Sequence, residues 1–284
     1  MDDGSPLAGP AREVPLSARL QFLFGGFLNQ FGWFFLGFGL VFVRIFGGAA
    51  DLSAVTAFHG RLETAPAALS VVRRTGFSAN KRRVFAFDYS FQEDGETYHG
   101  TSFSQDDRLS GPVTAEFPAG HPSLSRLRGM RRKPFGPGAL FVVIFPVIGL
   151  VILAFGLRKA LRGIRLLRRG MLATGRQSGM APTNTTVNGR VVYELTYAFK
   201  TASGEERTVK ARSERPEGFD EAAEPVVYDP VDRDNAMLLD DLPGRPRLDE
   251  DSVTRTTSGA TLAGVLAVPA FFTVVHLVWW LLAR

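Results

Sequence analysis

The sequence predicts an α+β membrane protein in which three transmembrane helices separate two repeated, small all-β soluble domains of barrel- or sandwich-like form. Three observations predict this class: long apolar runs almost without charge, two segments with the alternating pattern of strands, and a match between those segments at constant spacing. In chain order we expect an N-terminal tail (1–19), transmembrane helix one (20–46), a first β-domain (47–137), transmembrane helix two (138–157), a basic amphipathic juxtamembrane helix (158–169), a second β-domain (170–242), an acidic linker (243–260) and transmembrane helix three (261–282).

The three apolar runs are long enough to cross a membrane. Residues 20–46 carry no charge before Arg44, residues 138–157 carry none, and residues 261–282 carry none apart from a possible proton on His276. A helix rises about 1.5 Å per residue, so about 20 residues cross a hydrocarbon core of about 30 Å. The first run is too long for the apolar part of a cleavable signal peptide, and acidic residues precede it. We therefore expect three membrane spans.

Small and polar residues follow one stripe of the first span. Their spacing of four, three, four and three residues is typical of a seam between packed helices, and the stripe consists of Gly25, Asn29, Gly32, Leu36 and Gly39. Small residues let a second backbone approach, and an amide can hydrogen-bond to a neighbouring helix. The alternative is that Asn29 and Gln30 line an ion or substrate path. We favour helix packing, because a path usually recruits polar groups from several helices.

The two soluble segments contain an internal repeat. Residues 75–91 align without a gap with residues 183–199, at an offset of 108, and six of these 17 positions are identical. Within them, large apolar side chains alternate with smaller or polar ones, which predicts half-buried strands. The expected core consists of Phe85, Phe87, Tyr89 and Phe91 in the first copy and Tyr193, Leu195, Tyr197 and Phe199 in the second. Glycine turns at Gly95 and Gly204 follow the two runs.

The same features resemble a known family. They are the run Phe31-Gly32-Trp33 with Gly37-Phe38-Gly39, the segment Arg126 to Phe135, the pair Phe145-Pro146, and the two Tyr-x-Phe strands followed by glycine turns. Together they resemble a bacterial family of membrane proteins known only as domain of unknown function three-five-nine-two. The resemblance extends from about Leu20 to Leu242. It implies a membrane location and a pair of small β-domains, and it supplies no catalytic residue.

Composition and motifs argue against several chemistries. The absence of cysteine excludes disulfides, thiolate metal sites and cysteine nucleophiles, while the net charge of +5 is too small to indicate a nucleic-acid partner. His59, His99 and His121 are 40 and 22 residues apart, unlike the close pairs of zinc sites. Residues 229–235 lack the central glycine and distant glutamate of a calcium loop, so a turn is the better interpretation. No phosphate-binding or serine-hydrolase motif occurs. We expect no enzyme, metal or cofactor.

A basic stripe follows the second span. Four arginines at spacings of four, three and four predict one face of a helix, and they are Arg158, Arg162, Arg165 and Arg169. Leu157, Leu161 and Ile164 occupy the adjoining stripe. An amphipathic helix of this kind lies at the level of the lipid headgroups, where each cation near an anionic leaflet contributes about 1 kcal/mol. We expect these four arginines to bind membrane lipids.

Charge near the spans predicts the orientation. Eleven cations flank the spans on the side of the N-terminus and the second β-domain, against seven on the other side. Positive residues near span ends are retained in the cytoplasm, so we expect a bacterial inner-membrane protein with a cytoplasmic N-terminus. The expected function is a non-enzymatic scaffold whose β-domains bind an unidentified envelope protein or a second copy of the chain. The alternatives are an accessory subunit of a transporter or channel and, with less support, an envelope enzyme.

Overall fold

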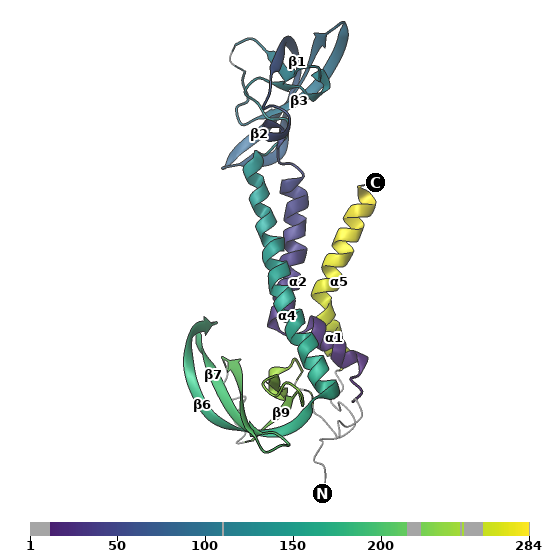
Figure 1. The fold of residues 1–284 in the computed structure, drawn as a ribbon. Coiled ribbons are helices and arrows are strands. Elements are labelled where there is room, and N and C mark those ends of the chain that lie inside the picture. Colours follow the sequence, from purple (N-terminus) through teal and green to yellow (C-terminus); the bar gives the residue numbers. More distant parts are fainter. Residues whose placement is uncertain (1–11, 110, 215–222, 245, 247–257, 284) are drawn as a thin grey trace. The chain divides into compact units, whose positions relative to one another are not determined.

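The computed structural model describes residues 12–109, 111–214, 223–244, 246 and 258–283 (Figure 1). The chain divides into two units, which are residues 1–37 with 147–284 and residues 38–146. Each unit contains one sheet and parts of the apolar helices, and each is described by itself.

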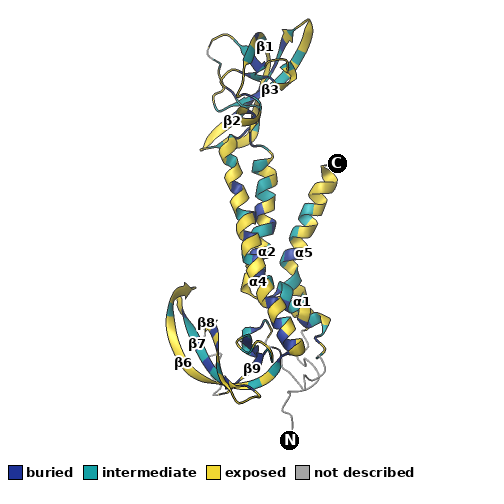
Figure 2. Cartoon of the chain, viewed as in Figure 1, coloured by how far each residue is buried: buried dark blue, intermediate teal, exposed yellow. Residues whose placement is uncertain are grey.

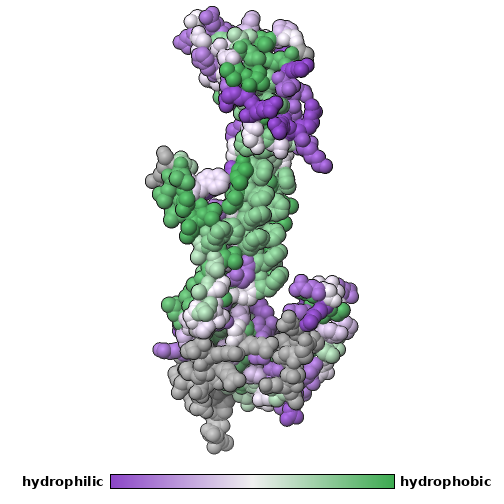
Figure 3. Space-filling model, turned by 180° about the vertical axis from the view of Figure 1, so that it is seen from behind, coloured by the Kyte–Doolittle hydropathy of each residue, from purple (hydrophilic) through white to green (hydrophobic). Residues whose placement is uncertain are grey.

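The fold is α+β, as predicted. Three helices are long and apolar enough to cross a membrane, namely Phe27–Gly47, Pro137–Arg169 and Gly259–Leu282. The strands form two five-stranded antiparallel sheets. Hydrophobic side chains cover most of the helical surface in the space-filling view, and hydrophilic side chains predominate on the sheets (Figure 3). The exposed side chains of the C-terminal helix are mostly apolar, which is typical of a surface that lipid or another helix covers (Figure 2).

The first apolar run is not the single helix that we expected over 20–46. Helix α1 (Leu16–Phe24) ends at Gly25, helix α2 (Phe27–Phe42) follows, and a π-helical turn η1 (Val43–Gly47) completes the span. Between α1 and α2, Gly26 has a φ of +75°, a conformation that side chains with a Cβ rarely adopt. The pair of glycines therefore breaks the helix, and the expected boundary at residue 20 is wrong.

The second and third runs form long helices. Helix α4 (Ile144–Arg169) follows a 3₁₀ turn η3 (Pro137–Val143) and continues without a break through the basic segment. Helix α5 (Gly259–Leu282) begins at Ser258, whose hydroxyl accepts a hydrogen bond from the backbone N–H of Thr261. The basic juxtamembrane helix is thus an extension of the second span.

The first sheet lies in the unit of residues 38–146. Its strands are β1 (Leu62–Ala79), β2 (Arg82–Glu93), β3 (Glu96–Ser104), β4 (Thr114–Pro118) and β5 (Arg126–Leu127), with the short helices α3 (Ser53–Thr56) and η2 (Pro122–Leu124). The strand order is β3-β2-β1-β4-β5. Phe87, Tyr89 and Phe91 are buried in its core, whereas Phe85 is partly exposed.

The second sheet has the same order of strands. It consists of β6 (Met171–Val187), β7 (Arg190–Lys200), β8 (Glu206–Ser213), β9 (Glu224–Tyr228) and β10 (Ala236–Leu238), followed by the turn η5 (Leu239–Asp241). Its order is β10-β9-β6-β7-β8. Leu195, Tyr197 and Phe199 are buried in its core, and Tyr193 is partly exposed. Strands β6 and β7 form a long, curved hairpin (Figure 1).

The two sheets also share their register. Ala67 pairs with Phe91 in the first sheet, and Gly175 pairs with Phe199, which lies 108 residues further on, in the second. Both hairpins interrupt their ladders at corresponding positions, once after residues 69 and 177 and again after residues 74 and 182. In each sheet the strand at one end also lies against the strand at the other end, so each sheet curls on itself.

Candidate functional site

The polar side chains of the apolar helices contact backbone carbonyl groups. Asn29 donates from Nδ2 to the carbonyl of Phe22 at 2.9 Å. Gln30 donates from Nε2 to the carbonyl of Phe24 at 2.5 Å and to that of Val265 in α5 at 2.6 Å. Because the carbonyls at the end of a helix lack intrahelical partners, these amides cap α1 at the break. Asn29 and Gln30 thus have structural partners.

The imidazole of His276 contacts the first span. Its Nε2 lies 3.1 Å from the carbonyl oxygen of Gly37. This contact joins α5 to α2, and Phe34 and Phe272 add a ring contact between the same helices at 6.0 Å. The contact of His276, like those of the two amides, therefore links helices.

Four of the five residues of the predicted packing stripe face α4. A Cβ added to Gly32 would lie 2.9 Å from the backbone of Leu153, and one added to Gly39 would clash with Pro146. Leu36 and Asn29 are in turn approached by two glycines of α4, Gly149 and Gly156. Gly25 does not join them, because it ends α1 and its neighbour is the carbonyl of Gln21.

Sequence reasoning missed the α4 side of this seam. Gly149 and Gly156 are seven residues apart, and a Cβ on either would strike the backbone of Leu36 or the side chain of Asn29. The same seven-residue period that marked the first span was therefore present in the second.

The arginines of the basic stripe of α4 are exposed to solvent, and one of them also binds the protein. All four arginines are exposed, but Arg162 donates to the side chain of Asn235 at 2.5 Å and to the carbonyl of Ala236 at 3.2 Å. Beside the stripe, Lys159 forms an ion pair with Asp241 at 2.7 Å. Leu166 and Leu167 of the same segment are buried in a core cluster of the protein. The basic end of α4 is therefore also a support for the second sheet.

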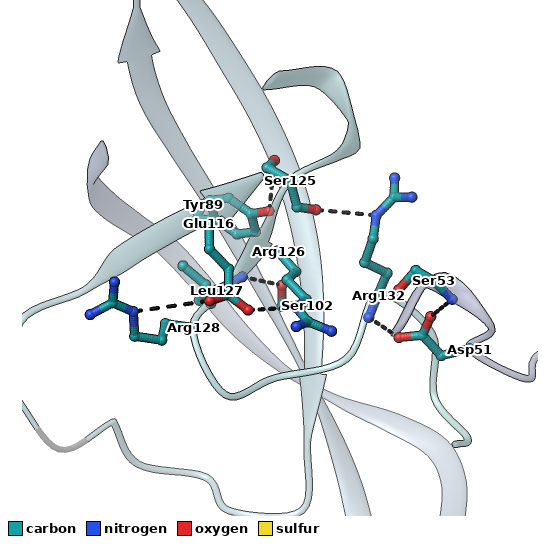
Figure 4. A network of polar contacts seen from close by, with 10 residues as sticks. All are labelled: Asp51, Ser53, Tyr89, Ser102, Glu116, Ser125, Arg126, Leu127, Arg128 and Arg132. Carbon is teal, nitrogen blue, oxygen red and sulfur yellow. Dashed lines mark hydrogen bonds and ion pairs between the residues drawn. The ribbon is translucent and has the colours of Figure 1, made fainter. Parts of the chain in front are cut away.

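The first sheet contains a network of polar contacts on β4 and β5 (Figure 4). Arg126 donates from Nε to Oε1 of Glu116 at 2.6 Å, and the Arg128 Nε lies 4.0 Å from the other carboxylate oxygen. The guanidinium carbon of Arg126 also lies 4.0 Å from the centroid of the Phe58 ring. These side chains hold two adjacent strands and the segment that covers them.

The same network extends to Tyr89 and Ser125. Tyr89 donates its hydroxyl proton to Oγ of Ser125 at 2.9 Å, and the Ser102 hydroxyl accepts from the backbone N–H of Leu127 at 2.8 Å (Figure 4). Burial raises the pKa of Tyr89, although its hydrogen-bond contacts with Ser125 and Ser102 act in the opposite direction. An activated hydroxyl nucleophile needs the opposite shift or an adjacent base. This arrangement is therefore suited to holding loops together.

Asp51 joins the segment before the first sheet to its last loop. Its carboxylate accepts from the backbone N–H groups of Ser53 at 2.8 Å and Arg132 at 2.6 Å. Burial alone would raise the pKa of Asp51, but hydrogen bonds from Ser53, Arg132 and Lys133 outweigh burial and lower it from the ordinary value of 3.8. The ionised carboxylate is thus the form that the fold favours.

The candidate metal ligands are dispersed. Within the described part of the chain, no group of three or more His, Asp or Glu side chains is placed to hold a metal ion. Asp229 accepts backbone hydrogen bonds from Val231 at 2.9 Å and Asp232 at 3.3 Å, which is the geometry of a turn. Of the acidic linker, residues 245 and 247–257 lie outside the described residues.

We found no relative of this chain among known proteins. No family model, curated protein or solved structure matches the chain. The resemblance to domain of unknown function three-five-nine-two therefore stays a prediction.

Proposed function

We propose that this chain is a multi-pass protein of the bacterial inner membrane whose two β-sheet domains are non-enzymatic interaction modules. Three long apolar helices support the membrane location. The amides of Asn29 and Gln30 support it further, because a donor in hydrocarbon needs a partner within the protein and the NH2 group of each donates to a backbone carbonyl. The same contacts favour a scaffold over a transporter subunit, in which we would expect polar groups to line a path.

The repeat belongs to this proposal. Identical strand order, paired residues at an offset of 108 and matching ladder interruptions support two copies of one domain. In both copies a threonine hydroxyl at the second interruption donates to a strand carbonyl, from Thr75 to Val84 at 2.6 Å and from Thr183 to Val192 at 2.7 Å. We take this shared detail as support for a duplication, because a threonine in the same interruption of two unrelated hairpins is an improbable coincidence.

The observation that carries the interaction function is a long free edge in each sheet. Strand β1 pairs with β4 only over residues 62–66, and β6 pairs with β9 only over residues 171–175. Beyond those points, one edge of each strand has no partner among the described strands. Apolar side chains are exposed there, including Val71 at 48% and Met180 at 54%. Such an edge is a template for pairing with another chain.

Orientation completes the proposal. The excess of cations around the N-terminus and the second sheet supports a cytoplasmic N-terminus, with the second sheet in the cytoplasm and the first outside. A phosphatase fused after Gly111 should then be active, and a fluorescent protein fused after Gly218 should fold and emit. An inactive phosphatase with a dark second fusion, both expressed, would reverse the orientation.

The interaction function is testable because the chain has no cysteine. Val71→Cys places a single thiol on the free edge of β1, and Gln92→Cys places one at an exposed position of the paired strand β2 as the matched control. With a maleimide photo-crosslinker in native membranes, we expect a discrete adduct from position 71 and little from position 92. The mass of the adduct distinguishes a second copy from an envelope protein. Equal labelling without a position-specific adduct would contradict the proposal.

A further inference from the structure

A cavity in the unit of residues 38–146 lies where the first sheet meets the ends of the apolar helices. Its volume is about 460 Å³, within the range of about 300–1,000 Å³ that is usual for small-molecule sites. Its lining comes from the end of α2 with η1, from η3, from the turn between β1 and β2, and from the loop after β5. The cavity thus combines a helical apolar wall with polar groups of the sheet.

The wall of the cavity is aromatic. The rings of Phe42 and Phe46 lie 5.5 Å apart, and the rings of Phe46 and Phe135 are separated by the same distance. Phe141 also lines the cavity and is 68% exposed. Because Phe42 and Phe141 belong to the two apolar runs, this wall continues the helical surface that would face lipid tails.

Arg131 supplies a cation at the cavity. Two backbone hydrogen bonds with Phe103, of 2.7 and 3.1 Å, fix its position beside β3. Its Nε is buried and has no hydrogen-bond partner among the described residues. A buried donor on a charged group costs free energy unless an acceptor is supplied, and a guanidinium binds phosphate through two parallel hydrogen bonds. Arg131 also lines the cavity, so its guanidinium can pair with an anionic group that enters it.

The turn of the first hairpin closes the cavity and adds positive charge. Asn80 lines it, and Lys81 follows with Arg82 and Arg83. The turn is held in place from two sides, by the 5.3 Å contact between the rings of Phe77 and Phe135 and by the hydrogen bond from Gln105 to the carbonyl of Ala79 at 2.7 Å. Arg82 pairs with Asp106 at 2.7 Å, and Lys81 and Arg83 beside it add positive charge that attracts anionic headgroups.

We propose that this cavity binds one anionic phospholipid, with its phosphate on Arg131 and an acyl chain along the wall of Phe42, Phe46 and Phe141. The aromatic wall selects a lipid rather than free phosphate, because an inorganic anion would leave that wall unused. The inference rests on the proposed membrane location, since a lipid reaches the cavity only where these helix ends meet a bilayer. It is separate from the arginine stripe of α4, which belongs to the other unit.

Native mass spectrometry of the full chain in uncharged detergent tests the proposal. The probes are dioleoylphosphatidylglycerol, dioleoylphosphatidylcholine with the same chains, and glycerol 1-phosphate, which has the anion without the chains. We expect one tightly bound phosphatidylglycerol and at least about tenfold weaker binding of the other two probes. Equal binding of phosphatidylcholine, which has the same phosphate but no net charge, would contradict selection of an anionic lipid, and equal binding of glycerol phosphate would contradict a lipid.

Two variants locate the site. Arg131→Gln should weaken phosphatidylglycerol binding at least about tenfold, whereas Arg74→Gln, which removes the same charge from an exposed position of β1, should leave it unchanged. Gly138→Leu keeps the arginine and adds a bulky side chain at a residue that lines the cavity, where a Cβ would meet no atom within 4 Å. It should also lose the lipid, and it provides the test should Arg131→Gln fail to fold. Unchanged binding in Gly138→Leu, or in a folded Arg131→Gln, would overturn the proposal.

A separate measurement isolates the proposed membrane location. Membranes that contain the wild-type chain are washed at alkaline pH, which releases peripheral proteins and retains integral ones. Retention without phosphatidylglycerol binding would overturn only the lipid site. Release into the wash would overturn the membrane location, whatever the lipid measurement gives.

Discussion

The two sheets pair their strands in the same register but place opposite chemistries on corresponding strand positions. In the first sheet, Thr64 pairs with Glu116, which pairs in turn with Arg126. In the second sheet, Leu172 pairs with Val227, which pairs with Met237. An ion pair in one sheet thus corresponds to a fully apolar pair in the other, although the backbone ladders are equivalent.

The difference follows from what covers each face. Val227 and Met237 are buried in a cluster with Leu166 and Leu167 of α4 and Phe22 of α1, so apolar side chains lose contact with water. In the first sheet, the ring of Phe58 lies over the guanidinium of Arg126, and both charged side chains remain slightly exposed, at 11 and 17%. Strand register therefore sets which residues are adjacent, and the covering element decides their polarity.

The largest effect is expected from a charge placed beneath the helices. Val227→Glu puts a carboxylate into the cluster at a position that is 0% exposed and surrounded by apolar side chains. We expect a loss of more than about 3 kcal/mol in the free energy of unfolding, as for other unpaired buried charges. Thermal unfolding in detergent, followed by circular dichroism, measures it. Val231→Glu, at a position 92% exposed, is the control and should change the midpoint little. Equal midpoints would disprove the covering argument.

The corresponding experiment in the first sheet replaces its ion pair. Glu116→Val leaves the mostly buried Arg126 without its carboxylate, and we expect a loss of about 2 kcal/mol, less than for a fully buried pair. Adding Arg126→Met imports the apolar pair of the second sheet and should recover at least half of that loss. Hydrogen exchange of the peptides that contain β4 and β5 reports the local free energy of opening. If the double variant is as unstable as Glu116→Val alone, the apolar pair of the second sheet cannot replace the ion pair of the first, although both occupy the same strand register.

A smaller effect should be equal in the two sheets. The hydroxyls of Thr75 and Thr183 donate to the carbonyls of Val84 and Val192 where each ladder is interrupted. Replacing either threonine with valine keeps its branched shape but removes the donor, which should cost about 1 kcal/mol in each hairpin. Hydrogen exchange in the two hairpins compares the losses. A loss of stability in one hairpin and none in the other would contradict the structural equivalence of the two sheets.

The sequence predicted the features that depend on local periodicity. The alternation from Phe85 to Phe91 and from Tyr193 to Phe199 predicted half-buried strands, and the apolar runs predicted three candidate spans. The break at Gly25 and Gly26 escaped prediction, because glycine is common in membrane helices and the break depends on amides that reach back to α1.

The candidate site was less predictable than the fold. The spacing of the α4 arginines predicted their shared face, but the contact of Arg162 with Asn235 joins residues 73 positions apart and leaves no periodic signal. The ion pair between Glu116 and Arg126 depends in the same way on the pairing of two short strands, β4 and β5. The sequence did not predict a role for Arg131, because the burial of its Nε and the missing hydrogen-bond partner depend on tertiary packing.

The smallest expected effect concerns the tips of the two hairpins. The first turn contains Asn80 and Lys81, with φ angles of 53° and 63°, and the second contains Asn188 and Gly189, with 50° and 76°. Asparagine followed by glycine is the preferred pair for a two-residue turn with positive φ at both positions, whereas a lysine there meets a Cβ clash of about 1–2 kcal/mol.

Exchanging lysine and glycine between the two turns tests whether the turns are equivalent. Lys81→Gly should stabilise the first hairpin by about 0.5–1 kcal/mol, since relief of the Cβ clash exceeds the entropy cost of glycine. Gly189→Lys should destabilise the second hairpin by about 1 kcal/mol. Hydrogen exchange of the two turn peptides, measured without anionic lipid so that the charge of Lys81 has no membrane partner, compares the changes. Opposite signs in the two hairpins would support equivalent turns, whereas a destabilising Lys81→Gly would show that the lysine side chain makes a stabilising contact for which the second hairpin has no counterpart.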